Sequence, residues 1–422
     1  MKLTTQILAA LAVGGFNSSL AFATELELPA SSPATEAEPA QPTSTAAAAP
    51  AEPASALPAW LAPLRFALFV DAYATFQSNG PGTRATLSGH RAFSGQGANL
   101  RSENGFGLSW LGFDLGYDAG AYGAVANVRF GQAVALYHHR ASADNDAVFG
   151  VDRLTQAYVF WKPLEPLALQ LGMFTSPFGV EALESWKNPN YTISALYVYG
   201  QPSWHMGLKA NWQLNSAWSV MGLIVNGVNS ISEAQEHGGL DQSPNLGASV
   251  GYAPSKAFSC GLGGLFALDN ADNDDAGFDA FVDLVSTLKL AAWTTSLNAD
   301  FIWTRGGAPS GKNRQFWGGS LTTGYRFTPR VALAARGEYL RDDANFDGRS
   351  GDLWQLLVGT LTLDLQPVRH VPNLIVRFEN RAERSNQRIF GHSSRGTEAT
   401  EDDTYRRTWF QSVLGVVVTT TP

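Results

Sequence analysis

Ionisable residues recur at every second position in two late segments of this sequence. Arg336 and Glu338 are separated by one residue, and Arg377, Glu379 and Arg381 repeat that spacing. In an extended chain, residues two positions apart lie on the same face. Charges that share a face can pair with one another, or they can set up an electric field that acts on ions and polar molecules nearby. The chemistry that these residues predict is therefore electrostatic, and it makes or breaks no covalent bond.

Two acidic stretches resemble calcium-binding loops only in part. Asp343-x-Asn345-x-Asp347-Gly348 matches the first half of an EF-hand loop, but the twelfth position is Trp354, where a bidentate glutamate belongs. A cluster of aspartates at 269–275 is denser but lacks the spacing. Binding of a hard cation by either loop stands against the simpler interpretation of solvated loop carboxylates. We predict no metal site and no cofactor.

Patterns typical of nucleotide, metal or nucleic-acid binding are weak. The seven histidines lack metal-ligand spacing, and the adjacent His138 and His139 would point to opposite faces of a strand. No glycine-rich phosphate loop follows a strand and opens a helix. The formal net charge is −8, and no cluster of Lys and Arg offsets it. This balance argues against a nucleic-acid partner.

The elements that must position the charged residues are strands with one apolar and one polar face. In the segment 293–303, Trp293, Leu297, Phe301 and Trp303 share one face with Ala299. Threonine, serine, asparagine and aspartate occupy the alternate positions. Apolar residues toward lipid, aromatic residues at both interfaces and polar residues toward a lumen are typical of a transmembrane β-barrel strand.

Bulk composition agrees with this interpretation. The chain has 422 residues, of which 45% are hydrophobic and only 16% are charged. No run of 18 apolar residues occurs beyond the N-terminus, so the sequence predicts no membrane-spanning helices. Only helices and closed barrels satisfy every backbone hydrogen bond inside lipid, which leaves a barrel as the form of an integral protein.

The N-terminal region has a different character. Residues 1–23 combine a positive start, a short apolar stretch and the small-x-small pattern of Ala21-Phe-Ala23, which predicts a cleaved secretory signal peptide. Residues 24–58 are rich in Ala, Pro, Glu, Ser and Thr, and we expect a disordered periplasmic linker. The barrel is expected to occupy residues 59–422.

Alternation and turn residues predict about sixteen antiparallel strands, an even number as bacterial single-chain barrels require. We expect 107–118 to change phase at a bulge near Gly112, and 218–227 shows no clear facing. Short turns alternate with long polar connections such as 78–104 and 384–407, as expected for periplasmic turns and outer loops. The predicted strands are 65–77, 107–118, 121–132, 154–163, 167–175, 205–214, 218–227, 245–254, 258–268, 278–290, 293–304, 316–327, 331–341, 353–365, 373–383 and 409–419.

The phase of each strand assigns its inward residues. Charges are costly on a lipid face, so ionisable residues on the other face belong in water or in pairs. One interpretation is a transverse field with arginines and carboxylates on opposite walls of a pore, and the other is a set of neutralising ion pairs that rigidify the lumen. The residues that we predict to line the pore from the strands are Asp71, Arg129, Lys209, Asp283, Asp300, Arg326, Arg336, Glu338, Arg377, Glu379 and Arg381.

A long connection at 175–203 carries more large apolar residues than a solvated outer loop needs. Phe178, Leu183 and Trp186 accompany Glu181 and Glu184. We expect this connection to fold inward and narrow the lumen, with both glutamates facing the passage. The alternative is an outer loop packed on its neighbours.

Several short motifs resemble the OmpL-like β-barrel porin family. They are Gly172-Met-Phe-Thr-Ser-Pro-Phe-Gly-Val-Glu181 with Asn190 and His205-Met-Gly207, then Gln156-Ala-Tyr-Val159, Val225-Asn-Gly227, Leu333–Asp342 and Val376–Arg381. Their order and spacing cover most of residues 65–383. The resemblance implies a Gram-negative outer-membrane barrel.

The sequence thus predicts an outer-membrane porin, a passive aqueous channel for small hydrophilic solutes or ions, that is surrounded by lipid and is not an enzyme. The alternative is a plugged barrel with a structural or surface-interaction role. A lipid hydrolase at the rim is a weaker third possibility, because no His–Ser pair lies at an outward position near the rim. Wide barrels of this kind often form trimers, so we consider a homotrimer, although no contiguous apolar loop surface marks an interface.

Overall fold

A computed structural model describes residues 63–78, 104–137, 153–226, 244–267, 279–306, 308, 311–343, 353–368, 371, 373–391 and 405–420. The predicted signal peptide and linker lie outside these ranges. So do His138 and His139, the acidic cluster at 269–275 and most of the loop that follows Asp343. Among the described residues, no helix is long and apolar enough to cross a membrane.

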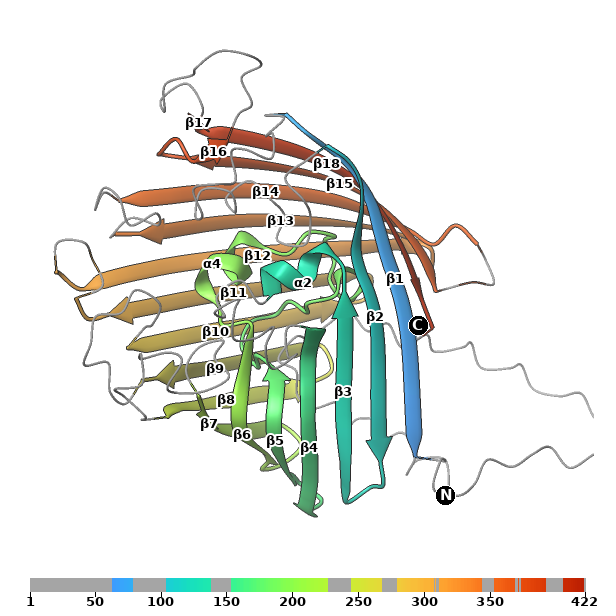
Figure 1. Ribbon diagram of the computed structural model, residues 1–422, viewed down its shortest axis with the longest axis vertical. Coiled ribbons are helices and arrows are strands. Elements are labelled where there is room, and N and C mark those ends of the chain that lie inside the picture. Colours follow the sequence, from blue (N-terminus) through green and yellow to red (C-terminus); the bar gives the residue numbers. More distant parts are fainter. Residues whose placement is uncertain are drawn as a thin grey trace, which may run out of the picture.

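The described chain forms a closed barrel of sixteen antiparallel strands in which each strand pairs with its neighbours in sequence (Figure 1). The last strand pairs with the first and closes the ring. A two-stranded ribbon of β16 (Phe390–Gly391) and β17 (Tyr405–Arg406) stands apart. The barrel strands are β1 (Leu64–Gln77), β2 (Gly105–Asp118), β3 (Tyr122–Phe130), β4 (Leu154–Leu164), β5 (Leu167–Thr175), β6 (Trp204–Gln213), β7 (Trp218–Val225), β8 (Asn245–Ser255), β9 (Phe258–Phe266), β10 (Ala280–Leu290), β11 (Trp293–Thr304), β12 (Arg314–Thr328), β13 (Val331–Asp342), β14 (Trp354–Leu365), β15 (Leu374–Ser385) and β18 (Thr408–Thr419).

The sixteen predicted strands are confirmed, and each end agrees with the structure to within two residues. One detail of phase was wrong. The bulge in β2 lies at Ser109 and not near Gly112, because Asp71 pairs with Trp110 while Ala72 pairs with Leu108. The extra residue lets Ser109 and Trp110 both be buried in succession. β7, which had no clear predicted facing, buries Leu223 and exposes Ile224.

The two faces of the strands follow the predicted alternation. In β11, Trp293 and Leu297 are 51% and 40% exposed, whereas Asn298 and Asp300 are each 3% exposed. Aromatic pairs flank the outer surface near the short turns, such as Trp293 with Tyr325 at 4.7 Å between ring centroids. An apolar outer band with aromatic ends is the surface that a lipid bilayer requires.

A pair of glycines bends the ends of β5 and β6. Gly172 and Gly207 face each other in the register, with φ of +133° and +156°. A Cβ atom would lie 2.4 Å from the Ala157 carbonyl oxygen at Gly172, and at Gly207 it would lie 2.3 Å from that of Ile224. Beyond this pair the outward alternation ends, and Met173 is buried in an apolar cluster. The glycines therefore allow the strand ends that flank the long connection to leave the regular wall.

Candidate functional site

The long connection between β5 and β6, residues 176–203, is called the inner segment here. It contains a short 3-10 turn, η4 (Ser185–Lys187), and a short helix, α4 (Ala195–Gly200). Figure 1 shows α4 within the curve of the barrel strands, near the helix α2 (Gln132–Tyr137). Polar atoms of the inner segment bond to inward residues of β1, β3, β10, β11, β13 and β15, and the Asn190 amide donates to the Thr362 hydroxyl of β14 at 2.7 Å. The predicted inward folding is thereby confirmed, and the alternative of an outer loop is wrong.

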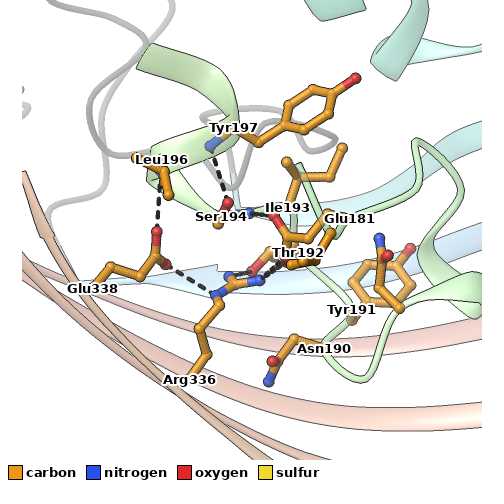
Figure 2. A network of polar contacts seen from close by, with 12 residues as sticks. Glu181, Asn190, Tyr191, Thr192, Ile193, Ser194, Leu196, Tyr197, Arg336 and Glu338 are labelled. Atoms are coloured by element: carbon orange, nitrogen blue, oxygen red, sulfur yellow. Dashed lines mark hydrogen bonds and ion pairs between the residues drawn. The ribbon is translucent and has the colours of Figure 1, made fainter. Parts of the chain in front are cut away.

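Arg336 on β13 connects the barrel wall to the middle of the inner segment (Figure 2). Its Nη1 donates to Glu181 Oε1 at 2.6 Å and to the Thr192 carbonyl oxygen at 2.8 Å. Its Nε donates to Glu338 Oε1 at 2.9 Å, and Glu338 Oε2 accepts from the backbone N–H of Leu196 at 3.1 Å. The side chains of Arg336 and Glu338 are fully buried and that of Glu181 is 9% exposed, so the arginine and both carboxylates satisfy one another largely away from bulk water.

β15, which is separated from β13 by β14 alone, repeats this arrangement. Glu379 accepts from the backbone N–H groups of Tyr191 at 2.6 Å and Thr192 at 3.1 Å. Arg381 donates to the Ile193 carbonyl oxygen at 2.7 Å and pairs with Glu383 at 2.7 Å. The backbone N–H and C=O groups of the inner segment thus bond to the row of alternating charged side chains on β15.

A third set of contacts holds η4. Arg377 pairs with Asp364 at 2.7 Å and donates to the Ser185 carbonyl oxygen. The Ser185 hydroxyl donates to Asp71 Oδ2 at 2.7 Å, and the Tyr191 hydroxyl donates to Asp71 Oδ1 at 2.6 Å. Asp71 on β1 thus fixes two points of the inner segment.

Glu184 joins the inner segment to β3, which lies two strands from β1 in the ring. It pairs with Arg129 on β3 at 2.6 Å and with Lys187 at 3.1 Å, while Arg129 also pairs with Asp114 at 2.5 Å. Burial alone would raise the pKa of Glu184, but the charges of Lys187 and Arg129 lower it from 4.5 to about 2. Glu184 is therefore ionised at neutral pH.

Both ends of the inner segment are held by one patch on β10 and β11. Gly179 N–H donates to Asp283 Oδ2 at 3.1 Å, and the Gln201 amide donates to Asp300 Oδ2 and to Asn298 Oδ1, each at 2.8 Å. Gly179 has a φ of +84°, and a Cβ atom there would lie 2.3 Å from Gln201 Oε1. The glycine lets the two ends approach each other at this patch.

Apolar contacts complete the docking of the inner segment on several sides. Phe178 packs edge-on against Phe281 of β10 with ring centroids 5.1 Å apart. Leu183 belongs to a cluster with Phe69 and Trp110, and Leu196 belongs to a cluster with Trp354. A fourth cluster joins Tyr191 to β1, β15 and β18. Shape as well as charge therefore holds the inner segment in place.

The structure brings most of the predicted pore residues together around the inner segment. Arginines and carboxylates alternate along the same strands and pair with one another, which is the ion-pair arrangement. Glu181 and Glu184 contact arginines of the wall. Arg326 lies apart from this network, near a short turn, where it donates to the Pro329 carbonyl oxygen at 3.3 Å. Lys209 also stays outside, beside Phe174. Whether these residues line a conducting path stays a prediction.

Some residues of the network were not singled out from the sequence. Glu383 continues the alternate spacing of Arg377, Glu379 and Arg381, so the pattern itself could have found it. Asn298 was placed on the inward face without a role. The backbone groups of residues 191–193 carry no sequence signal. Among the described residues, no group of three or more His, Cys, Asp or Glu could hold a metal ion.

Comparisons with known proteins identify the type of barrel. The model of a family described as "Putative beta-barrel porin-2, OmpL-like" matches residues 63–411. The outer membrane channel DcaP of Acinetobacter baumannii superposes with a TM-score of 0.54 at 11% identity, covering 84% of this chain and 96% of that chain. An anion-selective porin from Comamonas acidovorans gives 0.53 at 11% identity, covering 84% and 99%. OmpT of Vibrio cholerae gives 0.50 at 10% identity, covering 84% and 97%. These structural likenesses show the fold, and a comparison with curated proteins found no match.

Proposed function

The chain belongs to the OmpL-like beta-barrel porin-2 family, and from this premise we propose that it forms a passive aqueous channel for small hydrophilic solutes or ions. Membership of this family supports a location in the outer membrane, with the apolar band of the barrel against lipid. The observation that carries the proposal is the contrast between the two faces of one closed barrel, apolar outside and polar inside. No covalent chemistry is part of this function.

The inner wall toward the short turns supports a wet lumen. Small hydroxyl residues and glycines occupy inward positions of β7 to β12 there, and a sixteen-stranded barrel is too wide for such side chains to fill. The half-exposed ones are Ser219, Ser249, Gly251, Ser259 and Gly261, whereas Thr287, Ser296 and Thr322 are buried among their neighbours. The inner segment lies farther from the short turns than this region does, and we propose that it sets the width of the passage. The short turns mark the periplasmic end by the usual asymmetry of such barrels.

Planar-bilayer recording of the refolded chain tests the channel directly. We expect stepwise conductance in potassium chloride, and a barrel that never conducts would contradict the proposal. The reversal potential in a salt gradient then reports the ion preference. Empty vesicles and vesicles with a heat-denatured sample serve as controls.

A plugged barrel with a structural or surface-interaction role is the second candidate, because the inner segment packs into apolar clusters on several sides. Liposome swelling with sugars of graded size separates the two functions. An open channel admits small sugars and excludes larger ones, whereas a plugged barrel gives no swelling with any of them.

We also propose a homotrimer, since wide porin barrels often form trimers, and a trimer is one of the closed cyclic assemblies that homo-oligomers adopt. Native mass spectrometry of the detergent-solubilised protein checks this. A single mass of three chains is expected, and a mass of one chain at all detergent concentrations would contradict it.

A further inference from the structure

Lys209 on β6 differs from the arginines of the inner wall. Its side chain is only 3% exposed, and its Nζ lies over the ring of Phe174, 4.6 Å from the centroid. Arg129, Arg336 and Arg381 each meet a carboxylate, but no carboxylate of the described chain pairs with Lys209. Burying a charge without a counter-ion is costly. Binding of an anion beside the Lys209 ammonium group would therefore be favourable.

Two further polar side chains, one opposite Lys209 and one opposite Phe174, have buried atoms without hydrogen-bond partners among the described residues. Gln170 is the cross-strand neighbour of Lys209, and its buried Oε1 accepts no hydrogen bond. His205 is the cross-strand neighbour of Phe174, and neither of its buried ring nitrogens has a hydrogen-bond partner. The His205 ring lies 6.1 Å from the Phe174 ring between centroids. Lys209 and Phe174 are in contact, and each has one unsatisfied polar side chain as its cross-strand neighbour.

The chemistry of these three side chains suits an oxyanion. Lys209 offers a positive charge and His205 offers an N–H donor. The Gln170 amide offers its N–H₂ donors when it is turned over from the orientation in which Oε1 is unpaired. The apolar side chains of Met221, Leu223 and Phe281 complete this part of the wall, and a low local dielectric strengthens the attraction between an ammonium group and an anion. The side chains packed on this side bring no competing carboxylate of the described chain into contact with Lys209.

The carboxylates elsewhere in the barrel are already bonded to other groups. Asp283 and Asp300 accept from the ends of the inner segment, and Asp71 and Glu379 accept from its middle. None of these four carboxylates pairs with Lys209. A bound anion would supply the negative charge that no described carboxylate provides there.

We propose that Lys209, Gln170 and His205 form a binding subsite for the carboxylate or phosphate group of a small anionic solute, on the β5–β6 wall of the lumen. This assignment rests on the proposed channel function, since a solute reaches the subsite only through the lumen. The subsite makes one step of an otherwise passive passage selective for anions.

Thermal unfolding of the full-length protein in detergent tests binding without any need for conductance. A ligand that binds the folded state raises the melting temperature in a saturable way. Sodium succinate and inorganic phosphate are the two probes, each compared with sodium chloride at equal ionic strength. We expect a saturable rise with at least one probe, and the probe that acts identifies the carboxylate or the phosphate source. No saturable rise with either probe would overturn the proposal.

Variants at Lys209 assign the binding to this position. Lys209→Gln is expected to weaken the apparent affinity at least tenfold, whereas Lys209→Arg keeps the charge and retains binding. Lys162→Gln is the matched control, because Lys162 also lies over a phenyl ring, that of Phe160 at 5.2 Å, but near a short turn. Equal affinity in Lys209→Gln and the wild-type protein would overturn the assignment, and unchanged heat-modifiable migration on gels shows that the variants fold.

Bilayer recordings separate this proposal from the channel itself. The probe that binds should reduce the wild-type potassium chloride conductance with the same concentration dependence, and Lys209→Gln should lose this effect. A protein that binds the probe but never conducts refutes the channel and leaves the subsite standing. A protein that conducts but binds neither probe refutes the subsite and leaves the channel standing.

Discussion

At the scale of single residues, three arginines share one arrangement. Arg336, Arg377 and Arg381 each pair with a carboxylate of the wall and each donate to a backbone carbonyl oxygen of the inner segment. The planar guanidinium group, with several fixed donors, suits this double role better than an ammonium group does. These arginines connect the barrel wall to a segment that has no strand partners of its own.

We therefore expect Arg336→Ala to loosen the inner segment. Removing the arginine leaves Glu181 and Glu338 buried without their cation, a change that typically costs about 3–5 kcal/mol. The melting temperature should fall and the single-channel conductance should rise. Arg336→Lys should restore only part of both, because it keeps the charge and loses the fork.

Arg326→Ala is the control for this experiment. Its guanidinium group donates to a carbonyl oxygen of its own turn, away from the network. An Arg326→Ala protein that changes as much as Arg336→Ala would show that the loss of any lumen arginine suffices, and the connecting role of Arg336 would be refuted.

Glu184 makes the stability of the folded protein depend on pH. Its folded-state pKa of about 2 lies below the ordinary value of 4.5. The ionised carboxylate therefore stabilises the folded state above about pH 4.5, and this contribution is lost as the pH falls toward 2. The melting temperature of the wild-type protein should decline over this range more steeply than that of Glu184→Gln. Glu165→Gln, in an exposed short turn, should keep the wild-type decline, and parallel curves for all three proteins would contradict the prediction.

Sequence patterns could identify the charged residues of the wall but not their partners. Alternation placed Arg336, Glu338 and Glu379 on the inward face because a strand has a period of two. Their partners on residues 191–193 are backbone groups, and every residue has those. For the same reason, no pattern could reveal that Lys209 lacks a carboxylate neighbour. Pairing across a lumen depends on the closure of the whole ring.

At the scale of elements, the glycine pair of β5 and β6 decides where the inner segment leaves the wall. Gly172→Ala or Gly207→Ala would place a Cβ atom against a backbone oxygen of the adjacent strand and in an unfavourable φ region. We expect each to destabilise the protein by about 1–3 kcal/mol, measured as a lower melting temperature in detergent.

Gly337 and Gly359 offer a matched control. They also face each other across two strands, β13 and β14, but a Cβ atom at either position meets nothing within 4 Å. Alanine there should change the melting temperature little. Equal losses at both pairs would show that the bend between β5 and β6 is unimportant.

The strands themselves were the most predictable elements. Each has an apolar face for lipid and a polar face for the lumen, so composition and period report the same structure. The bulge at Ser109 was misplaced because a change of phase locates a bulge only within the few residues where both phases fit. α4 escaped prediction because its six residues are held by tertiary contacts and not by a helical period.

At the scale of the whole molecule, the inner segment and the barrel are separable in principle. The sixteen strands form a continuous ring of hydrogen bonds, to which the inner segment contributes no strand. Replacing residues 182–199 by a short glycine-serine linker should leave the barrel folded and raise its conductance at least about twofold, because the lumen loses its filling. Bilayer recording and heat-modifiable gel migration measure the two parts of this prediction. Unchanged conductance in a folded variant would mean that the inner segment does not limit the passage.

The seam between β1 and β18 sets a condition on how the molecule matures. It joins Phe69 to Thr419 and Gln77 to Gln411, residues from the two extremes of the barrel sequence. The two strands lie at opposite ends of the barrel sequence, so the ring cannot close until the chain has been made as far as β18. Throughout that interval both margins of the ribbon present unpaired backbone groups. A polypeptide that lacks either β1 or β18 cannot form this seam, and both edges of its sheet stay unpaired.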